Sequence, residues 1–563
     1  MTFRKSILLL ISLMMIAALV GCSSNSSTPP PPPPPPTGPL PDGNYVFSVA
    51  GFDNFGTNGS QYYVAGSITI SGGAITGGEQ DWVDFNNGPL MDPITAAGSS
   101  VTASTDGNLI IVLATADTAI GVAGVETFNG TILPASTTSR TFITEFDASA
   151  SGSGELDTQD ITGAGAATPS AGYAFVLGGY DSVTGGTGNG GCDEAMGGII
   201  NVDGSGTISG TGSIFDANDC GSGYTFAGET IANTSTVSAP DASGRVTFTL
   251  DATDSADFPE IILAGYIVDS GHIRIVETAD TYEGVLGGVA LSQGANTGTF
   301  VSNAALVPGT YVAGLVGWDN DGALQLVNQL TLTAGTPNTV VGFADFNDLI
   351  NTSMAVSPDP VTGNAYSVDA AGAGDITIGD INDDGNSGTT VGGGYNLQVY
   401  LDGNGNALAI TMDETDVIGG FGGEQTGAGG FTAASFSGAY GLNVTGWDVN
   451  GIGEFDAVGP ITADGVGTTT GTADVNWVYS TGPTYPDQTV TGTFVTTGAG
   501  AAAGIFSQGT ITGLDMTTCT AFTTTGAGCT ADVFSYYLLD ATGDNIAIET
   551  DTNQVSLATS EQQ

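Results

Sequence analysis

Basic side chains are nearly absent from this chain. Its 563 residues include 58 Asp and Glu but only 5 Lys and Arg, which gives a formal net charge of −53. After Lys5 the basic residues are Arg140, Arg245 and Arg274. Binding of nucleic acid or anionic lipid headgroups needs Lys and Arg to neutralise phosphate, so these partners are excluded. The self-repulsion of so acidic a chain must be relieved by solvation, by cations or by low pH.

Catalytic chemistry also has few candidates. His272 is the only histidine, and it alternates with Arg274 in a strand-like segment, which is typical of an exposed strand residue. No nucleophile motif accompanies it, as a serine triad would require. Two carboxylates can hydrolyse a glycoside, but an acid-rich composition singles out no pair. We therefore predict no enzyme and assign no catalytic residue.

Helical periodicity is missing beyond the N-terminus, and the composition is that of a β protein. Apolar residues make up 40% of the chain, mean hydropathy is +0.16, and there are 89 glycines. Segments such as residues 108–114 (NLIIVLA), 244–250 (GRVTFTL) and 396–401 (NLQVYL) are rich in β-branched and apolar residues. These features predict an all-β fold with short strands and tight turns rather than a disordered acidic chain.

A motif recurs four times along the chain. Each copy begins with a tyrosine, followed six residues later by glycine, an aromatic residue and aspartate; the tyrosines are Tyr45, Tyr173, Tyr311 and Tyr440. Their spacings of 128, 138 and 129 residues correspond to a whole small domain rather than to a solenoid repeat.

Three further features follow each tyrosine in constant order. The first is an Asp-x-Asn beginning at Asp84, Asp216, Asp345 and Asp474. The second is a glutamate with an aspartate shortly after it: Glu145, Glu277, Glu414 and Glu549. The third is a closing glutamine: Gln159, Gln293, Gln425 and Gln562.

The repeats predict four tandem antiparallel β domains of about eight strands each, at residues 42–160, 170–295, 306–427 and 436–563. Hairpin-connected units of this size form either up-and-down barrels or sandwiches. We favour barrels, because the regular recurrence of the opening and closing strands makes first-to-last pairing plausible.

Two interpretations of the Gly-aromatic-Asp motif remain open. In the structural one, glycine allows a bend, the ring covers the core and aspartate accepts backbone hydrogen bonds in a turn. In the functional one, the ring stacks on a sugar, and Trp318 and Trp447 are the first candidates for ligand stacking.

The N-terminus has the order of a secretory signal. Arg4 and Lys5 precede an apolar run from Ile7 to Val20, which ends in Leu19-Val20-Gly21-Cys22. This ending resembles the lipobox of bacterial lipoproteins. The resemblance implies a signal peptide over residues 1–21, its removal before Cys22, and lipid attachment to the sulfur of Cys22.

A spacer follows the lipidated cysteine. Residues 22–41 contain eight successive prolines from Pro29 to Pro36, which predict a polyproline II rod of roughly 25 Å. Ser23 and Ser24 stand where an aspartate would signal retention in the inner membrane. We therefore expect an outer-membrane protein that faces the periplasm or the cell surface.

The other four cysteines fall in pairs within repeats. Cys192 and Cys220 lie in the second repeat, and Cys519 and Cys529 lie in the fourth. Disulfides within each pair are the economical prediction for an exported protein, with a zinc site as the alternative.

No cofactor is certain from the sequence, but calcium is one candidate. Asp380, Asn382 and Asp384 alternate ahead of Gly385 as in the first half of a calcium loop. Val391 stands at the twelfth position, where an EF-hand has its bidentate acid, so a plain acidic turn is the alternative.

The functional hypothesis is a lipid-anchored protein with a structural or adhesive role in the bacterial envelope. Its expected partners are the membrane, through the lipid, together with envelope polysaccharide or surface proteins and cations. The alternative is a ligand-binding module for carbohydrate, for a calcium-dependent ligand or for a small apolar molecule inside a barrel. A secreted hydrolase that uses carboxylates is the third interpretation.

Overall fold

The computed structural model of the chain describes residues 40–563 apart from 54–59, 85–87, 105–107, 119, 133–139, 164, 166, 182–191, 220–224, 252–259, 280–283, 301–308, 320–321, 349–357, 379–394, 414–415, 428–429, 449–452, 478–483, 497–502, 513, 515–531 and 551–553. Nearly all regular structure in this part is β-strand. Its helices are short 3-10 turns such as η2 (Gly294–Asn296) and η6 (Ala433–Ser435). None of the helices described has the length and hydropathy of a membrane span.

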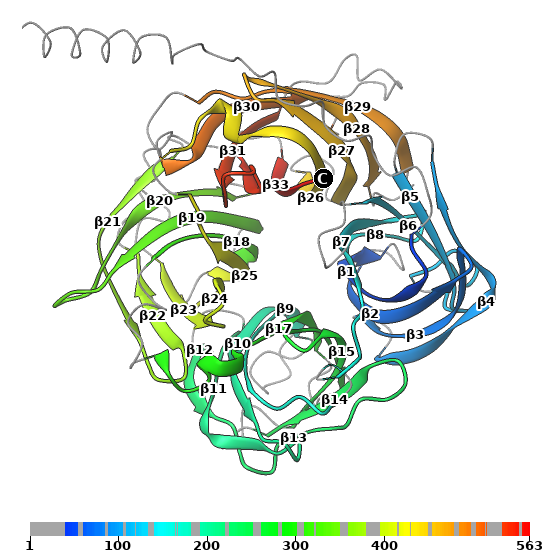
Figure 1. The fold of residues 1–563 in the computed structure, drawn as a ribbon, viewed down its shortest axis with the longest axis horizontal. Coiled ribbons are helices and arrows are strands. Elements are labelled where there is room, and N and C mark those ends of the chain that lie inside the picture. The colour runs from blue at the N-terminus through cyan, green and yellow to red at the C-terminus, as the bar shows by residue number, and fades with distance from the viewer. Residues whose placement is uncertain are drawn as a thin grey trace, which may run out of the picture. The chain divides into compact units, whose positions relative to one another are not determined.

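The strands follow one another in four groups (Figure 1). The first group is β1 (Gly43–Asp53), β2 (Ser60–Ser71), β3 (Ala74–Asp84), β4 (Leu90–Ala103), β5 (Asn108–Ala114), β6 (Val125–Ile132), β7 (Arg140–Phe146) and β8 (Ala150–Thr158). The second is β9 (Gly172–Asp181), β10 (Cys192–Val202), β11 (Ile208–Asp219), β12 (Thr225–Thr230), β13 (Thr236–Val237), β14 (Arg245–Leu250), β15 (Ile261–Asp269), β16 (His272–Ala279) and β17 (Val285–Ser292).

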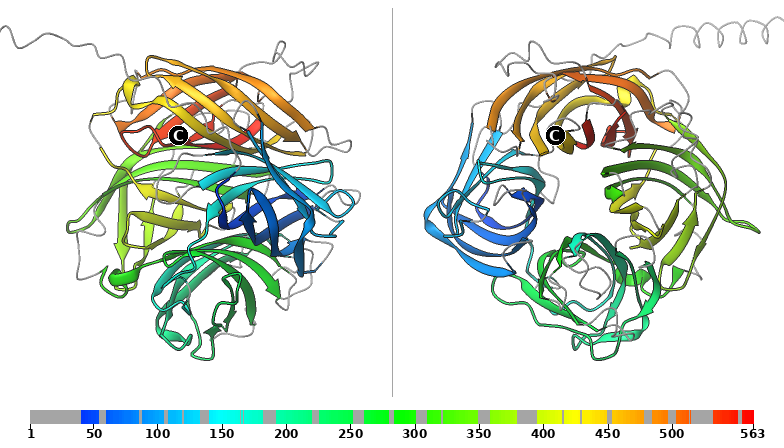
Figure 2. Two further views of the ribbon diagram at one scale, coloured as in Figure 1. Left: turned by 45° about the vertical axis from the view of Figure 1, so that its right-hand side comes forward. Right: turned by 180° about the vertical axis from the view of Figure 1, so that it is seen from behind.

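The third group is β18 (Gly309–Asp319), β19 (Ala323–Thr333), β20 (Thr339–Asp348), β21 (Asp359–Val368), β22 (Ala373–Thr377), β23 (Asn396–Leu401), β24 (Asn406–Thr411) and β25 (Asp416–Glu424). The fourth is β26 (Ser437–Asp448), β27 (Gly453–Asp464), β28 (Thr468–Trp477), β29 (Thr484–Thr493), β30 (Ile505–Thr512), β31 (Asp532–Leu538), β32 (Asn545–Glu549) and β33 (Gln554–Gln562). Figure 2 shows the same groups from two other sides.

Each group forms one antiparallel sheet, and three of the four sheets close on themselves. The first, third and fourth sheets are eight-stranded barrels in which the first strand pairs with the last. The second sheet has nine strands with β12 and β13 at its edges, and an isolated bridge joins Thr207 to Thr236 of β13. The predicted all-β fold of four tandem antiparallel units is therefore confirmed, with closure by strand pairing in three of them.

Alternation along the strands explains why the sheets curl around apolar interiors. In β14, Val246, Phe248 and Leu250 are buried, while the intervening residues are half-buried. Each sheet has its own buried core, represented by Phe47, Phe175, Leu326 and Phe534 in chain order. Burial of such side chains is the main favourable term in folding, at about 25 cal/mol per Å² of apolar surface.

The motif glycines allow the first and last strands of each sheet to approach closely. A Cβ on Gly51 would lie 2.0 Å from the carbonyl oxygen of Ser151 in β8, and one on Gly317 would lie 2.1 Å from that of Val417 in β25. Gly179 and Gly446 face the last strands of their sheets in the same way. Any side chain would collide there, so these glycines serve strand closure rather than the bend expected from the sequence.

The strand register corrects three positions of the predicted repeat. In each sheet, the residue three positions after the motif tyrosine lies on the first strand and pairs with a residue of the second strand. That residue in turn pairs with an aspartate of the third strand: Asp81, Asp216, Asp345 and Asp474. The first repeat therefore carries Asp81-Trp82-Val83 where Asp84-Phe85-Asn86 was predicted. The counterpart of the buried glutamates in the third repeat is Thr411 rather than Glu414.

The closing glutamine of the fourth repeat is also one residue later than predicted. The backbone N–H groups of Gln159, Gln293 and Gln425 donate to the carbonyl of the residue that precedes the motif tyrosine. In the fourth repeat this donor is Gln563, which bonds to Ala439, and not Gln562.

Candidate functional site at the interfaces between sheets

The repeated polar side chains lie where one sheet meets another. A tyrosine hydroxyl donates across each of the first three interfaces to the equivalent aspartate: Tyr266 to Asp81 at 2.6 Å, Tyr400 to Asp216 at 2.7 Å and Tyr537 to Asp345 at 2.6 Å. At the interface between the fourth and first sheets, Asn108 and Asn129 donate to Asp474 at 3.1 and 2.9 Å. The interfaces therefore form a closed cycle in which each sheet contacts the next and the fourth contacts the first.

The asparagine of the repeat joins the same interfaces through backbone carbonyls. The Nδ2 atom of Asn476 lies 2.7 Å from the carbonyl oxygens of Glu145 and Ala150. Asn218 and Asn347 make the matching contacts to the third and fourth sheets. Val83 occupies this position in the first repeat and is buried against the second sheet. The interface between the first and second sheets thus replaces a polar contact with an apolar one.

The closing glutamines reach from each sheet into the next. Gln159 donates to the carbonyl of Ile267, Gln293 to that of Leu401 and Gln425 to that of Leu538, at 2.6 to 2.8 Å. Gln563 donates to the hydroxyl of Thr131 in the first sheet at 3.1 Å. Every described closing glutamine therefore belongs to an interface and not to a ligand site.

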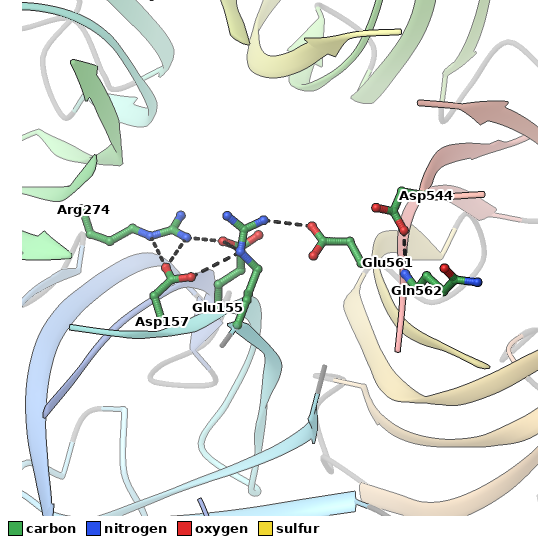
Figure 3. A network of polar contacts seen from close by, with 7 residues as sticks. Glu155, Asp157, Arg274, Asp544, Glu561 and Gln562 are labelled. Atoms are coloured by element: carbon green, nitrogen blue, oxygen red, sulfur yellow. Dashed lines mark hydrogen bonds and ion pairs between the residues drawn. The ribbon is translucent and has the colours of Figure 1, made fainter. Parts of the chain in front are cut away.

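Arg140 lies in the first sheet, and Arg245 and Arg274 of the second sheet contact the first. Arg245 binds Asp81 through Nε at 2.5 Å and Nη2 at 2.9 Å. Arg274 binds Asp157 at 2.7 Å and also contacts Glu155. Arg140 binds Glu561 of β33 at 2.8 Å and Asp157 at 3.2 Å. Figure 3 shows Arg274, Asp157, Glu155 and Glu561 of this network.

These arginines change the protonation of their neighbours. Although burial opposes ionisation, Arg274 and Arg140 hold the pKa of Asp157 well below its usual range. Burial, with the charge of Arg274 added, lowers the pKa of His272 to about 3. His272 was predicted to be exposed, but it is half-buried beside the arginine network and stays neutral at physiological pH.

The interface between the fourth and first sheets also contains a group of buried carboxyls. Glu126, Glu145 and Asp456 have no exposed surface, and Glu454 is 6% exposed. Burial raises the pKa of Glu126 to about 8 and that of Asp456 to about 7. Burial also raises the pKa of Glu145 and of Glu454 well above the usual range. The neighbouring Asp147 raises the pKa of Glu145 further, and Asp456 does the same for Glu454.

Raised carboxyl pKa values are typical of enzyme sites, but these carboxyls are not placed to meet a substrate. Gln80 and Thr115 donate to Glu126 at 2.7 and 2.9 Å, and Ser151 donates to Asp456 at 2.6 Å. Within the described residues, no group of three or more His, Cys, Asp or Glu is arranged to hold a metal ion.

Trp318 and Trp447 lie together, with Phe52 beside them. The centroids of the two indole rings are 4.8 Å apart in an edge contact. The rings of Phe52 and Trp447 also meet edge-on, with their centroids 4.7 Å apart. The three residues are the motif aromatics of the third, fourth and first repeats. Because the rings are in direct contact, no sugar or cation fits between Trp318 and Trp447 or between Phe52 and Trp447.

The motif aspartates take the structural role that the sequence suggested. Asp53 accepts hydrogen bonds from the backbone N–H and the hydroxyl of Ser60, at 2.9 and 2.8 Å. Asp319 accepts the N–H of Gly322 at 2.8 Å. Both carboxylates therefore hold the turn after the first strand of their sheet.

Most of the other predicted site residues lie outside the described part of the chain. These are Cys22, Cys220, Cys519, Cys529, Asp380, Asn382 and Asp384. Cys192 begins β10, and its predicted partner is among the residues not described. The lipid attachment, both disulfides and the calcium loop remain predictions.

Sequence reasoning missed the tyrosines that cross the interfaces. Tyr266, Tyr400 and Tyr537 stand 11, 11 and 12 residues before Glu277, Thr411 and Glu549, which occupy equivalent register positions. That spacing is visible in the sequence once the register is known. It was overlooked because Thr131 takes the place of the tyrosine in the first repeat.

The fold and its interfaces define the class of protein: a tandem β-barrel chain with a closed cycle of contacts between sheets. The chain matches no protein-family model and no curated protein.

Several solved structures match in part, among them the following three. A DUF3598-family protein of unknown function from Nostoc punctiforme is 10% identical, with a TM-score of 0.13 over 44% of this chain and 94% of its own. Kievitone hydratase from Nectria haematococca is 12% identical, with a TM-score of 0.16 over 47% and 97%. Transferrin binding protein B from Haemophilus parasuis is 10% identical, with a TM-score of 0.15 over 77% and 86%. Likeness at this level carries no functional inference.

Proposed function

We propose that this protein is a lipid-anchored structural element of the bacterial envelope, a rigid acidic body held off the membrane by its proline-rich spacer. The observation that supports the proposal most is the use of the repeated residues. The four recurring aspartates, the four closing glutamines and the three asparagines are engaged between sheets, so the repetition supports assembly of one body rather than four separate binding sites.

The interiors of the sheets support a structural role over a carrier role. The third sheet encloses a cavity of about 30 Å³, lined by residues such as Tyr311, Leu330 and Tyr366. A cavity in the second sheet, beside Phe175 and Met196, measures about 10 Å³. A single water needs 10 to 15 Å³ by this measure, so the larger cavity holds about two waters and no apolar ligand of ordinary size.

Replacement of the anchor tests the proposal. Cys22→Ser should leave the four sheets folded, with an unchanged melting temperature, but should release the protein from membranes into the soluble fraction. Cells that produce only this variant should then show the same loss of envelope integrity or of surface adhesion as cells without the protein. A variant that stays membrane-bound contradicts the anchor, and a released variant that supports a normal envelope contradicts the structural role.

The binding alternative has its own measurement. Glycan-array binding that is lost in Trp447→Ala and kept in Trp82→Phe would favour a carbohydrate-binding module. We expect no such binding, because Trp447 packs edge-on with both Trp318 and Phe52.

A further inference from the structure

The interface between the fourth and first sheets is held differently from the other three. Residues 159–171, 293–308 and 425–436 link consecutive sheets covalently, whereas the fourth and first sheets are joined only by non-covalent contacts. The described apolar cluster between the fourth and first sheets consists of Phe142 and Val458. The interface between the third and fourth sheets has a larger cluster, with Val312, Val327 and Ile546 among its members.

Both sides of this interface also contribute buried carboxyls. Glu126 and Glu145 come from β6 and β7, Asp147 follows β7, and Glu454 and Asp456 come from β27. One oxygen of each lacks a hydrogen-bond partner in the described structure: Glu126 Oε2, Glu145 Oε2, Asp147 Oδ2, Glu454 Oε2 and Asp456 Oδ1. The fully buried hydroxyl of Tyr62 from β2 lies among them, also without a partner.

Little positive charge is available to this cluster. The fourth sheet contains no Lys, Arg or His, because the last basic residue of the chain is Arg274. Arg140 of the first sheet is engaged with Glu561, Glu155 and Asp157. Asp117, after β5, adds a further acid beside Glu126. The groups that face the cluster from β2, β3 and β8 include Tyr62, Tyr63, Gln80 and Ser151, all of which are neutral.

A buried carboxyl without a cation is stable only in its protonated form. Protons would also give the unpartnered oxygens a donor, since a protonated carboxyl can bond to its neighbour. Protonation of these carboxyls therefore stabilises the closed interface.

We propose that the interface between the fourth and first sheets is a proton-dependent closure, which holds while the carboxyls of Glu126, Glu145, Asp147, Glu454 and Asp456 are protonated and opens when they ionise. Opening would convert the closed cycle of sheets into an open row that is held by its three covalent linkers. The inference extends the proposed structural function, but it rests on the interface alone and is tested on the isolated protein.

The direction of the pH dependence follows from the raised pKa values. A carboxyl whose pKa is higher in the closed state binds its proton more tightly there, so its stabilising effect is fully present below the open-state pKa of about 4.5. The effect is lost as pH rises, and the pKa values of about 7 for Asp456 and about 8 for Glu126 place much of the loss below pH 9.

Amide hydrogen exchange on the full chain in detergent tests the closure. Between pH 5.5 and 9, after correction for intrinsic exchange, protection of β27 and β8 should fall by roughly tenfold or more. Protection of β19 and β20, which border the interface between the third and fourth sheets, should change by less than about twofold. Equal protection of β27 and β8 at both pH values would overturn the proposal.

Substitution by neutral isosteres shows whether the pH response comes from this cluster or from other titrating groups. Glu145→Gln combined with Asp456→Asn should keep β27 and β8 protected at pH 9. The matched control is Asp193→Asn, because burial raises the pKa of Asp193 to about 7 in the second sheet. The control should leave the pH response intact, and a control that abolishes it would contradict the assignment to this interface.

A cross-link provides a test that does not depend on removing carboxyls. Ser153 Oγ of β8 and Asn443 Oδ1 of β26 lie 2.5 Å apart across the interface. Ser153→Cys with Asn443→Cys, once oxidised, should make the radius of gyration independent of pH, and reduction should restore its rise at pH 9. An oxidised protein that still expands as the wild type does would contradict opening at this interface.

Discussion

The interfaces on the two sides of the fourth sheet are built on different principles. Towards the third sheet, Val327 and Ile546 belong to an apolar cluster around the hydrogen bond from Tyr537 to Asp345. Towards the first sheet, Asp474 accepts from two asparagines and the buried carboxyls outnumber the apolar pair of Phe142 and Val458. Equivalent strands therefore make one interface with a large apolar cluster and another in which buried carboxyls outnumber the apolar side chains.

The largest expected effect comes from a charge placed in the apolar interface. Val327→Asp should reduce the free energy of unfolding by about 4 kcal/mol, because it buries an unpaired carboxylate where Val327 has no exposed surface. Denaturant titration measures the loss. Val341→Asp is the control, since Val341 is 49% exposed and should change stability by less than about 0.5 kcal/mol. Similar losses in the two variants would show that the cluster does not hold the interface.

Removal of the apolar pair at the other interface should have the next largest effect. Phe142→Ala should cost about 3 kcal/mol, because it empties the space that Phe142 fills against Val458. Hydrogen exchange should show the loss of protection first in β27. A loss spread evenly over all four sheets would contradict a local role for Phe142.

Loss of a single interface hydroxyl should cost less. Tyr537→Phe removes the 2.6 Å hydrogen bond to Asp345 and should lower stability by about 2 kcal/mol. Asn129→Ala should cost only about 1 kcal/mol, because Asn108 still donates to Asp474. Thermal unfolding of both variants makes the comparison, and a larger loss in Asn129→Ala would reverse the inferred redundancy.

The smallest effect should come from the outer ion pair. Arg140→Met should change stability by about 1 kcal/mol or less at low salt, because the Arg140 and Glu561 side chains are each 33% exposed. Arg245→Met should cost more, since Arg245 makes two bonds to a buried Asp81. Added salt should reduce the effect of Arg140→Met but not that of Arg245→Met.

Strand content and tandem organisation could be predicted because they depend on local patterns. Alternation such as that of Val246, Phe248 and Leu250 is visible in a short window, and the opening motif marks the first strand of every sheet. The register was less accessible, because insertions between strands shift the spacing. For this reason the sequence predicts Asp84, Glu414 and Gln562 as the repeated residues, whereas the register assigns these positions to Asp81, Thr411 and Gln563.

The roles of the repeated polar residues could not be predicted for another reason. Asn108 and Asp474 are 366 residues apart, and nothing in either neighbourhood shows that they meet. Asp and Asn favour turns in general, so the Asp-x-Asn pattern by itself does not indicate a contact between sheets. Only the contact between sheets shows that Asn476 binds carbonyls of the first sheet.

The equivalent use of the closing glutamines has a consequence for how the chain can be cut. Gln159, Gln293, Gln425 and Gln563 each reach into the following sheet, so the contacts themselves have no preferred starting point. A circular permutant that begins at the second sheet, with a flexible peptide joining the original ends, should fold to the same arrangement. In that molecule the interface between the fourth and first sheets would gain a covalent linker. The interface between the first and second sheets would lose its linker.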